Sequence, residues 1–300
     1  MIDGILNVYK EKGFTSHDVV AKLRGIVKQK KIGHTGTLDP DAVGVLPVCL
    51  GKGTKLCDML TDRSKTYEVV MRLGITTDTE DMTGTVLTNQ EVVCHNEQIQ
   101  TVVQSFVGEI EQVPPMYSAL KVNGKKLYEL AREGKVIERK ARLITIHSIE
   151  IKKIELPFVT MEVVCSKGTY IRSLCRDIGE ALGCGACMQE LIRTKVGTFS
   201  IEHSLTLSQI EQRVAEETLD SFLVGVEDAL KEYEAVSVKK ESDKLIHNGN
   251  PFCERDVLIQ NKNIDKERPI RVYDSNGTFI GMFEYREEKG RFYPQKMFYI

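Results

Sequence analysis

One carboxylate within a glycine-rich segment is the first candidate for chemistry in this 300-residue sequence. The segment GHTGTLDPDAVGVLPVCLGKGTK (33–55) places Asp39 immediately before Pro40, and a following proline restricts a residue to extended backbone conformations. His34 lies upstream among glycines, whose missing side chains let a backbone or a ligand approach closely. A rigidly held reacting carboxylate fits this pattern, and so does the cap of a tight structural turn.

A second candidate is KGTYIRSLCRD (167–177), where Arg172 and Arg176 share one face if the segment is helical. An arginine can keep a partly buried carboxylate ionised by lowering its pKa. Two solvated surface arginines are the alternative. Tyr67 and Tyr170 occur in strand-like contexts, where a tyrosine either belongs to the core or offers a flat ring to a nucleobase.

Other chemistries find less support in the sequence. Cys184 and Cys187 form a CxxC pair, but there is no second pair and no thioredoxin-like context, so we expect neither zinc binding nor redox chemistry there. Asp78, Glu80 and Asp81 lack the spacing of a calcium-binding loop and are expected to form a solvated turn. No Walker or Rossmann glycine pattern is present, which disfavours a nucleotide cofactor.

Hydrophobic periodicity predicts the elements that must position these side chains. The expected elements are strands at 5–9 and 65–74, a helix after the capping-box pair Thr15 and Asp18, a helix from Asn96 that ends by Gly108, a helix near 126–133, and a strand followed by a helix within 157–183. Beyond a boundary at 231–236, short apolar runs, many aromatic residues and a turn at 274–277 indicate a compact β appendage.

Composition places the chain among globular proteins, with 41% hydrophobic and 28% charged residues. No apolar run approaches the length of a membrane helix, and the N-terminus lacks the pattern of a secretory signal, so we expect a cytoplasmic protein without membrane contact. The 8 cysteines are scattered through apolar stretches and are expected to be reduced thiols.

The net charge of −2 disfavours a polyanionic partner only when it is taken globally. Residues 19–38 carry five lysines and arginines and no acid, and residues 121–153 carry ten against four glutamates. Residues 204–230 offset them with six acids against one arginine. The near-neutral total is therefore a cancellation between regions, and the local fields can still attract a nucleic acid.

Taken together, the motifs resemble the bacterial TruB family of tRNA pseudouridine synthases, which modify uridine 55 in the T arm. The resemblance rests on 33–55, KTYEVVMRLG (65–74), PPMYSALKVNGKKLYELAREG (114–134), KGTYIRSLCRDIG (167–179) and ELIRTKVGTF (190–199), in the family's order. The tail, with HNGNPF and RVYDSNGTFIGMF, is similar to a PUA RNA-binding module. Thr37 replaces a usual alanine, and Ile192-Arg193-Thr194 replaces a more usual pair of arginines.

The resemblance implies an α+β fold with a mixed, largely antiparallel sheet and flanking helices. It implies a pseudouridine synthase catalytic domain at 1–235 with a basic thumb insertion at about 117–153, and a small PUA-like β domain at 236–300. The implied activity is the isomerisation of a flipped uridine by cleavage of its N1–C1′ bond and rejoining through C5. No metal or cofactor is implied, because the reaction is redox-neutral.

By resemblance Asp39 is the essential catalytic residue. An anion suits this position because glycosidic cleavage builds positive charge at C1′, although removal of a sugar proton or attack on the base would also use a carboxylate. Arg172 would pair with Asp39, and Tyr67 would stack on the base and could assist proton removal at C5. His34, Tyr170 and Leu191 would line or support the pocket of the flipped nucleotide.

The expected partner is the T arm of tRNA, with no protein partner and a monomeric chain. Basic side chains before the catalytic segment and within the thumb insertion would bind its phosphates. They are Lys22, Lys28, Lys30, Lys31, Lys121, Lys125, Lys126, Arg132, Arg139, Lys140 and Arg142.

Two other functions compete with this interpretation. A non-catalytic RNA-binding or RNA-folding protein would share the basic insertion and the β tail, but would not need Asp39. A cofactor-free glycoside or nucleoside hydrolase could use Asp39, but such enzymes normally pair two carboxylates, and only Asp41 is near in sequence.

Overall fold

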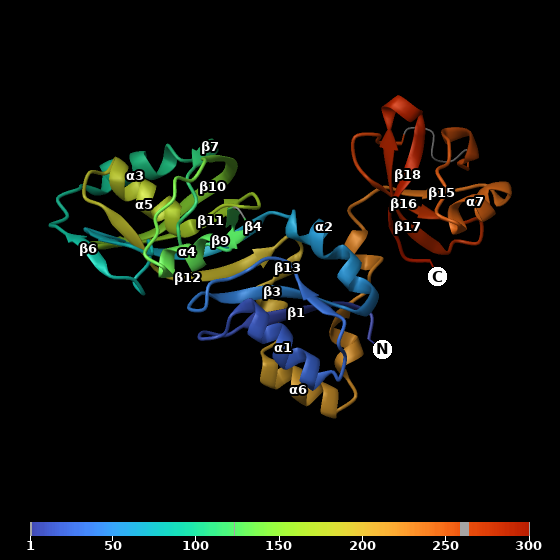
Figure 1. The fold of residues 1–300 in the computed structure, drawn as a ribbon, viewed down its shortest axis with the longest axis horizontal. Helices are drawn as coiled ribbons and strands as arrows, with labels where there is room; N and C mark the ends of the chain where they lie inside the picture. The colour runs from blue at the N-terminus through green and yellow to red at the C-terminus, as the bar shows by residue number, and fades with distance from the viewer. Residues whose placement is uncertain (1, 123, 259–263, 300) are drawn as a thin grey trace.

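A mixed sheet of ten strands runs through the larger part of the protein (Figure 1). The computed structural model describes residues 2–122, 124–258 and 264–299. The strands of this sheet are β1 (Gly4–Lys10), β2 (Ile32–His34), β3 (Val43–Leu50), β4 (Lys65–Leu73), β7 (Gly108–Gln112), β10 (Arg142–Glu155), β11 (Phe158–Cys165), β12 (Ala186–Val196), β13 (Phe199–Ser200) and β14 (Leu223–Val224).

The spatial order of the sheet is β14-β1-β3-β12-β4-β11-β10-β7, with β2 paired to β3 and β13 paired to β12. Among these described strands, every pairing is antiparallel except that of β3 with β12. The parallel contact joins Ile192 to Val43 and Arg193 to Gly44, and it connects the two halves of the sheet. The predicted mixed, largely antiparallel sheet is confirmed.

Helices cover both halves of this sheet (Figure 1). The described helices are α1 (Ser16–Ile26), α2 (Cys57–Thr61), α3 (Asn96–Gln104), α4 (Leu127–Arg132), α5 (Ile171–Ala181), α6 (Leu207–Ala215) and α7 (Asp243–His247). A 3₁₀ stretch, Gly51–Leu56, leads from β3 into α2. In the described part of the chain, no helix is long and apolar enough to cross a membrane.

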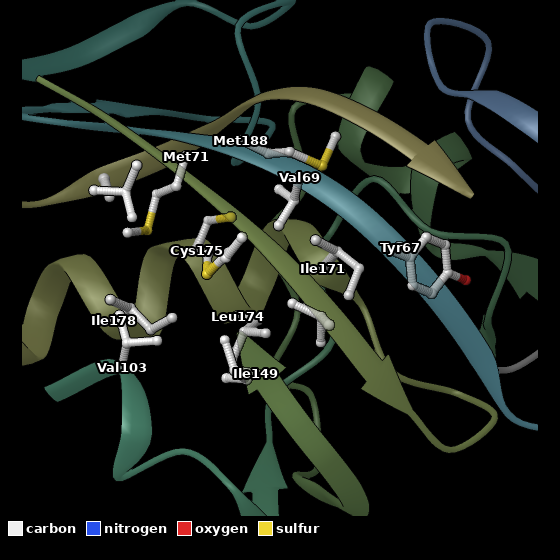
Figure 2. Packing of buried hydrophobic residues seen from close by; sticks show 14 of the residues in the cluster. Tyr67, Val69, Met71, Val103, Ile149, Ile171, Leu174, Cys175, Ile178 and Met188 are labelled. Carbon is white, nitrogen blue, oxygen red and sulfur yellow. The ribbon is translucent and has the colours of Figure 1, made fainter. Parts of the chain in front are cut away.

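One core lies between α3, α5 and the strands β4, β10, β11 and β12. Strand β4 alternates buried and more exposed residues because successive side chains point to opposite faces. Figure 2 shows Val69 and Met71 of β4 facing Leu174 and Ile178 of α5, while the Tyr67 ring lies at the end of this cluster with its hydroxyl directed away from it. Burial of these side chains fixes α5 against the sheet.

A second core lies where α1 and α6 pack on β1 and β3. Helix α1 begins with the predicted capping box, in which the Thr15 hydroxyl accepts a hydrogen bond from the Asp18 backbone N–H at 3.0 Å. The Asp18 carboxylate accepts one from the Thr15 backbone N–H at 2.8 Å. The capped helix is confirmed, as is the strand predicted at 5–9, which is one residue longer at each end.

The first part of the basic insertion, up to Arg132, forms elements outside the ten-stranded sheet, whereas residues 142–153 belong to β10 of that sheet. A two-stranded ribbon, β8 (Lys121–Val122) and β9 (Lys125–Lys126), leads directly into α4. A second ribbon, β5 (Ile75–Thr77) and β6 (Val86–Asn89), projects after β4, and the segment between its strands carries Glu80 and Asp81. Both ribbons lie on the same half of the molecule as α5 (Figure 1).

The C-terminal residues form a separate four-stranded sheet with its own core (Figure 1). Its strands, in the order of pairing, are β15 (Ala235–Ser237), β16 (Ile270–Tyr273), β17 (Phe279–Arg286) and β18 (Arg291–Met297). The predicted turn at 274–277 is present, with the Gly277 backbone N–H donating to the Asp274 carbonyl at 3.1 Å. The predicted small β unit is confirmed; its likeness to a PUA module stays a prediction.

Candidate active site

The segment between β2 and β3 carries Asp39. Thr35 is fully buried and donates through its backbone N–H and its hydroxyl to the Pro47 carbonyl, at 3.1 and 3.2 Å. The buried Ser16 hydroxyl accepts a hydrogen bond from the Leu38 backbone N–H at 2.9 Å. These contacts fix the segment at both ends, so the position of the Asp39 carboxylate is set by the fold rather than by a free loop.

Arg172 binds both oxygens of the Asp39 carboxylate. Its Nε lies 2.9 Å from Oδ2, and its Nη2 donates to Oδ1 at 3.2 Å. The Arg172 side chain is only 5% exposed, whereas that of Asp39 is 39% exposed. The pair is therefore held from the protein side and remains open to a substrate on the other side. This two-point contact is the geometry that arginine forms with carboxylates.

Two backbone carbonyls accept further hydrogen bonds from the Arg172 guanidinium. Nη1 donates to the Thr79 carbonyl at 3.1 Å, and Nη2 donates to the Tyr117 carbonyl at 2.9 Å. Arg172 lies in the first turn of α5, and Tyr170 is the N-cap residue of this helix. The structure thus decides between the two alternatives for Arg172 in favour of a carboxylate partner.

The expectation of a solvated turn at residues 78–81 is wrong for two of its three acids. Asp78 is exposed, but Glu80 is 8% exposed and the Asp81 side chain is 13% exposed. Asp81 Oδ2 lies 3.8 Å from Arg172 Nε, and Glu80 bonds to Ser173 and Arg176 of α5. The local sequence could not reveal this, because the partners that bury these acids lie far away in the chain.

Opposing influences act on the pKa of the Asp39 carboxyl. Partial burial raises the pKa above its ordinary value, whereas the Arg172 guanidinium lowers it and the Asp81 carboxylate adds to the increase. The net direction is upward. Lys10 contributes a further positive charge to this site.

Lys10 is a fully buried lysine at the end of β1. Its Nζ donates to the Pro40 carbonyl at 3.0 Å and to the Glu11 carbonyl at 3.1 Å. Burial lowers the pKa of Lys10 to about 8, while Asp39 and Asp41 oppose this effect. Lys10 therefore supports the segment that carries Asp39.

Tyr67 and Leu191 lie on the paired strands β4 and β12, where Tyr67 is opposite Arg193 and Leu191 is opposite Val69. Both belong to the cluster that also contains Leu38 and Ala42, two apolar residues of the Asp39 segment. Arg193 pairs with Tyr67 across the same strands and is 1% exposed. Burial raises the pKa of the Tyr67 hydroxyl, and the Arg193 guanidinium opposes that rise.

Arg193 ties the Asp39 segment to the sheet. Its Nε donates to the Val45 carbonyl at 2.7 Å, and its Nη2 donates to the Gly36 carbonyl at 3.4 Å. His34 stands at the end of β2, and burial together with the Arg193 charge lowers the pKa of its imidazole.

Tyr170 approaches the site from the start of α5. The Gln112 side-chain amide holds the Tyr170 backbone, accepting from its N–H at 2.8 Å and donating to its carbonyl at 3.1 Å. Burial raises the pKa of the Tyr170 hydroxyl, an effect that the Ser118 hydroxyl opposes. The structure therefore places His34, Tyr67, Tyr170, Arg172 and Leu191 around the segment of Asp39.

Sequence reasoning missed Lys10, Glu80, Asp81 and the buried role of Arg193. Only Arg193 had a signal, namely a charged residue inside the otherwise apolar stretch around ELIRTKV. For the other three, the deciding contacts join distant parts of the chain.

Most of the predicted RNA-binding residues lie on the surface. The exposed ones are Lys22, Lys28, Lys30, Lys31, Lys121, Lys125, Arg132, Lys140 and Arg142. Lys126 and Arg139 are half-buried: Lys126 Nζ lies 3.2 Å from the Tyr128 hydroxyl, and Arg139 Nη1 donates to the Pro114 carbonyl at 2.9 Å. Part of the Arg139 guanidinium is thus already engaged within the protein.

The cysteines are free thiols. Cys184 Sγ lies 3.9 Å from Cys94 Sγ, and Cys187 Sγ lies 3.4 Å from the Met82 sulfur, so the two members of the CxxC pair contact different neighbours. Among residues 2–122, 124–258 and 264–299 there is no group of three or more histidine, cysteine and acidic side chains that could hold a metal ion.

Two family profiles cover most of this architecture. Residues 24–171 match the N-terminal domain of TruB family pseudouridylate synthase, and residues 172–231 match the C-terminal domain of tRNA pseudouridylate synthase B. The chain belongs to the TruB family. Its activity is therefore that of a tRNA pseudouridine synthase, an isomerase. Asp39 falls within the first matched region and Arg172 begins the second, and the fold brings the two together.

TruB-family relatives match nearly the whole chain. The tRNA pseudouridine synthase B of Lachnoclostridium phytofermentans is 57% identical, covering 99% of this chain and 100% of its own length. The protein of the same name from Clostridium novyi is 48% identical, covering 94% of this chain and 95% of its own length.

Solved structures share the fold at lower identity. The crystal structure of a Cbf5-Nop10-Gar1 complex contains a chain that is 29% identical, with a TM-score of 0.73, covering 94% of this chain and 78% of that one. An H/ACA ribonucleoprotein bound to a substrate RNA containing 2′-deoxyuridine contains a chain that is 25% identical, with a TM-score of 0.73, covering 98% of this chain and 84% of that one.

Proposed function

We propose that this TruB-family enzyme isomerises uridine 55 in the loop of the tRNA T arm, and that Asp39 is its essential carboxylate. The observation that carries the proposal is the pairing of Asp39 with Arg172. The buried guanidinium binds both carboxylate oxygens, and the carboxylate side chain keeps 39% of its surface exposed. An anion that is oriented, and still accessible, is what a nucleotide entering the site would meet.

The reaction replaces the N1–C1′ bond of the uracil base by a C5–C1′ bond, while C5 loses its proton and N1 takes one up. Positive charge develops at C1′ while the first bond breaks, and the Asp39 carboxylate would stabilise or trap that charge. Arg172 keeps the carboxylate ionised and aimed. The flat ring of Tyr67 would stack on the base, with His34, Tyr170 and Leu191 as the surrounding support.

A uridine inside a folded loop must leave its stack before Asp39 can reach it, which costs a few kcal/mol. Contacts with the rest of the arm would offset that cost. Lys22 of α1, the exposed lysines just before β2 and those of the thumb insertion would bind phosphates, and the C-terminal β unit would act as the PUA-like RNA-binding module. We propose that the enzyme acts as a monomer.

The two competing functions have less support. A protein that only binds RNA is set aside by membership of a family of tRNA pseudouridine synthases. A hydrolase would need a second available carboxylate near Asp39. Asp81 is close, but its Oδ2 shares Arg172 with Asp39, and its Oδ1 accepts hydrogen bonds from the Thr79 hydroxyl at 2.7 Å and the Thr83 backbone N–H at 2.9 Å.

The specificity is tested with tRNA transcripts carrying tritium at C5 of uridine. We expect the enzyme to release one equivalent of tritium from a transcript with uridine at position 55, and none above background from the same transcript with cytidine there. Equal release from both transcripts would assign the activity to another uridine. A T-arm stem-loop of matched sequence serves as the minimal substrate in the same assay.

A further inference from the structure

We propose that Glu80 and Arg176 act together as a clamp that positions Arg172, and through it the Asp39 carboxylate, in the chemical step. The inference rests on the proposed role of Asp39. Both residues act through Arg172, so they are positioning residues and not catalytic ones. The clamp is built between the segment that joins β5 to β6 and the polar side of α5.

Glu80 has a backbone conformation that glutamate avoids. Its φ is +63°, in the left-handed region, where a side chain crowds the backbone. Such strained residues cluster at sites where the surrounding structure holds them for function. Contacts of its side chain must offset the strain here, and only 8% of the residue surface is exposed.

Both oxygens of the Glu80 carboxylate are bound by α5. Oε2 accepts a hydrogen bond from the Ser173 hydroxyl at 2.6 Å, and Oε1 accepts one from Arg176 Nη1. Arg176 is itself fixed by Asp177, whose Oδ1 accepts from its Nη2 at 2.6 Å and from its Nε at 2.9 Å. The carboxylate is therefore immobilised against the helix.

The immobilised residue sits between two groups that contact Arg172. The preceding Thr79 carbonyl accepts from Arg172 Nη1 at 3.1 Å, and the following Asp81 Oδ2 lies 3.8 Å from Arg172 Nε. The Glu80 carbonyl also accepts from the Met188 backbone N–H at 3.0 Å, which ties the segment to β12. A shift of Glu80 would therefore move the Thr79 carbonyl and the Asp81 carboxylate, two of the groups that contact the guanidinium.

This arrangement predicts an effect on rate with little effect on RNA affinity. The side-chain partners of Glu80 are Ser173 and Arg176, and both lie outside the set of predicted phosphate-binding residues. A displacement of a reacting group by about 1 Å can slow a reaction by about 100-fold. Loosening Arg172 also weakens its support of the ionised Asp39 carboxylate, so the Asp39 pKa should rise further.

The test compares Glu80→Gly and Glu80→Gln with the wild-type enzyme. Glycine removes the clamp and adopts φ +63° without strain, so it separates positioning from folding. Glutamine keeps the size and removes the charge. Glu180→Gln is the matched control, because Glu180 lies 3.9 Å from Arg176 Nε but its side chain is 67% exposed.

For both Glu80 variants we expect single-turnover tritium release to slow about 10- to 100-fold, with the Kd for tRNA within about twofold of wild type. We expect the acid limb of the pH–rate profile to move to higher pH, and the Tm of Glu80→Gly to stay at or above that of Glu80→Gln. Combining Glu80→Gln with Arg176→Gln should slow the reaction no more than the larger single effect, because the two residues act as one unit.

A rate within about twofold of wild type in Glu80→Gly would overturn the inference. So would a slower rate that accompanies a lower Tm with an unmoved acid limb, since that is the signature of a merely structural contact. Asp39→Asn is measured in parallel. If Asp39→Asn is inactive and Glu80→Gly is fully active, the clamp alone fails; if Asp39→Asn is fully active, the proposed function fails and the clamp with it.

Discussion

At the scale of single residues, two opposing influences act on the Asp39 carboxylate. The Arg172 guanidinium favours its ionised form, and partial burial disfavours that form. The bidentate contact with Arg172 brings the two requirements of the chemistry together, because it fixes the direction of the carboxylate and keeps it ionised. A lysine at position 172 would supply the positive charge but could not bind both carboxylate oxygens in the fixed geometry of a guanidinium.

This difference gives a prediction for Arg172→Lys. The variant should bind tRNA like the wild type and slow the chemical step by about 10-fold or more, since a single ammonium cannot hold both carboxylate oxygens. Single-turnover tritium release and filter binding measure the two quantities. A variant with reduced tRNA affinity and the wild-type rate would show that Arg172 contacts the RNA instead.

The same pair predicts the pH dependence of the reaction. The pKa of the Asp39 carboxyl is raised by burial, so the rate should fall as pH is lowered through a value above that of a free aspartate, about 3.9. Arg172→Lys weakens the contact that favours the anion and should move this limb further up in pH. Single-turnover rates from pH values of about 4.5 to 8 give the limb directly, and a shift to lower pH in the variant would show that Arg172 does not favour the anion.

Residue types alone gave candidates for the site and left their structural alternatives open. The proline after Asp39 and the arginine of the YIRS segment singled out two separate candidates, and only the resemblance to the TruB family implied that they pair. Lys10 and Glu80 gave no such signal. A lysine in a strand and a glutamate in a turn are ordinarily solvated, and only partners from distant segments make their burial tolerable.

At the scale of elements, the parallel contact between β3 and β12 decides where the site forms. It places the Asp39 segment, which leads into β3, beside the Leu191 and Arg193 positions of β12. Gly44 makes the close approach feasible: its φ is +108°, and a Cβ at this position would lie 2.3 Å from the Arg193 carbonyl oxygen.

Gly44→Ala should accordingly destabilise the fold by about 2 kcal/mol or more and abolish most of the activity, because β3 must move away from β12. Gly108→Ala is a close control, since Gly108 has φ +116° but open space around its Cβ position. Thermal unfolding and tritium release are compared for both variants. Equal effects in the two would mean that backbone strain, and not the strand contact, is responsible.

Elements were predictable where their signal is local. The alternation of β4 and the capping box of α1 both appear within a short stretch of sequence, and the structure contains both. The β3–β12 pairing joins Val43 to Ile192, far apart in the chain, and no periodicity encodes which strands become neighbours.

At the scale of the whole molecule, the overall charge of −2 conceals two basic regions. Lys22 of α1 and the lysines just before β2 are exposed, as are most of the basic residues in the thumb insertion. A tRNA would meet these local fields and not the average. The motif resemblance and the regional charges could be obtained from the sequence, whereas the engagement of Arg139 by the Pro114 carbonyl could not.

Neutralising Lys121, Lys125, Lys140 and Arg142 together should weaken tRNA binding and flatten its dependence on salt, by about 0.7–0.9 in the log–log slope for each phosphate that is no longer bound. The rate at saturating enzyme should change little. Lys152 and Lys153 of β10 provide the control pair, since both are exposed and neither is among the eleven predicted phosphate-binding residues. An unchanged slope in the fourfold variant would exclude these thumb residues from phosphate binding.

Tritium release by Asp39→Asn is the decisive measurement for the proposed mechanism. Asparagine keeps the size of the side chain and an oxygen that Arg172 can bind, but it cannot carry the charge. With a tRNA transcript labelled at C5 of uridine, the wild-type enzyme should release tritium from position 55 in single turnover, and Asp39→Asn should bind the same tRNA and release none above background. Release by Asp39→Asn at the wild-type rate would remove the carboxylate from the chemistry.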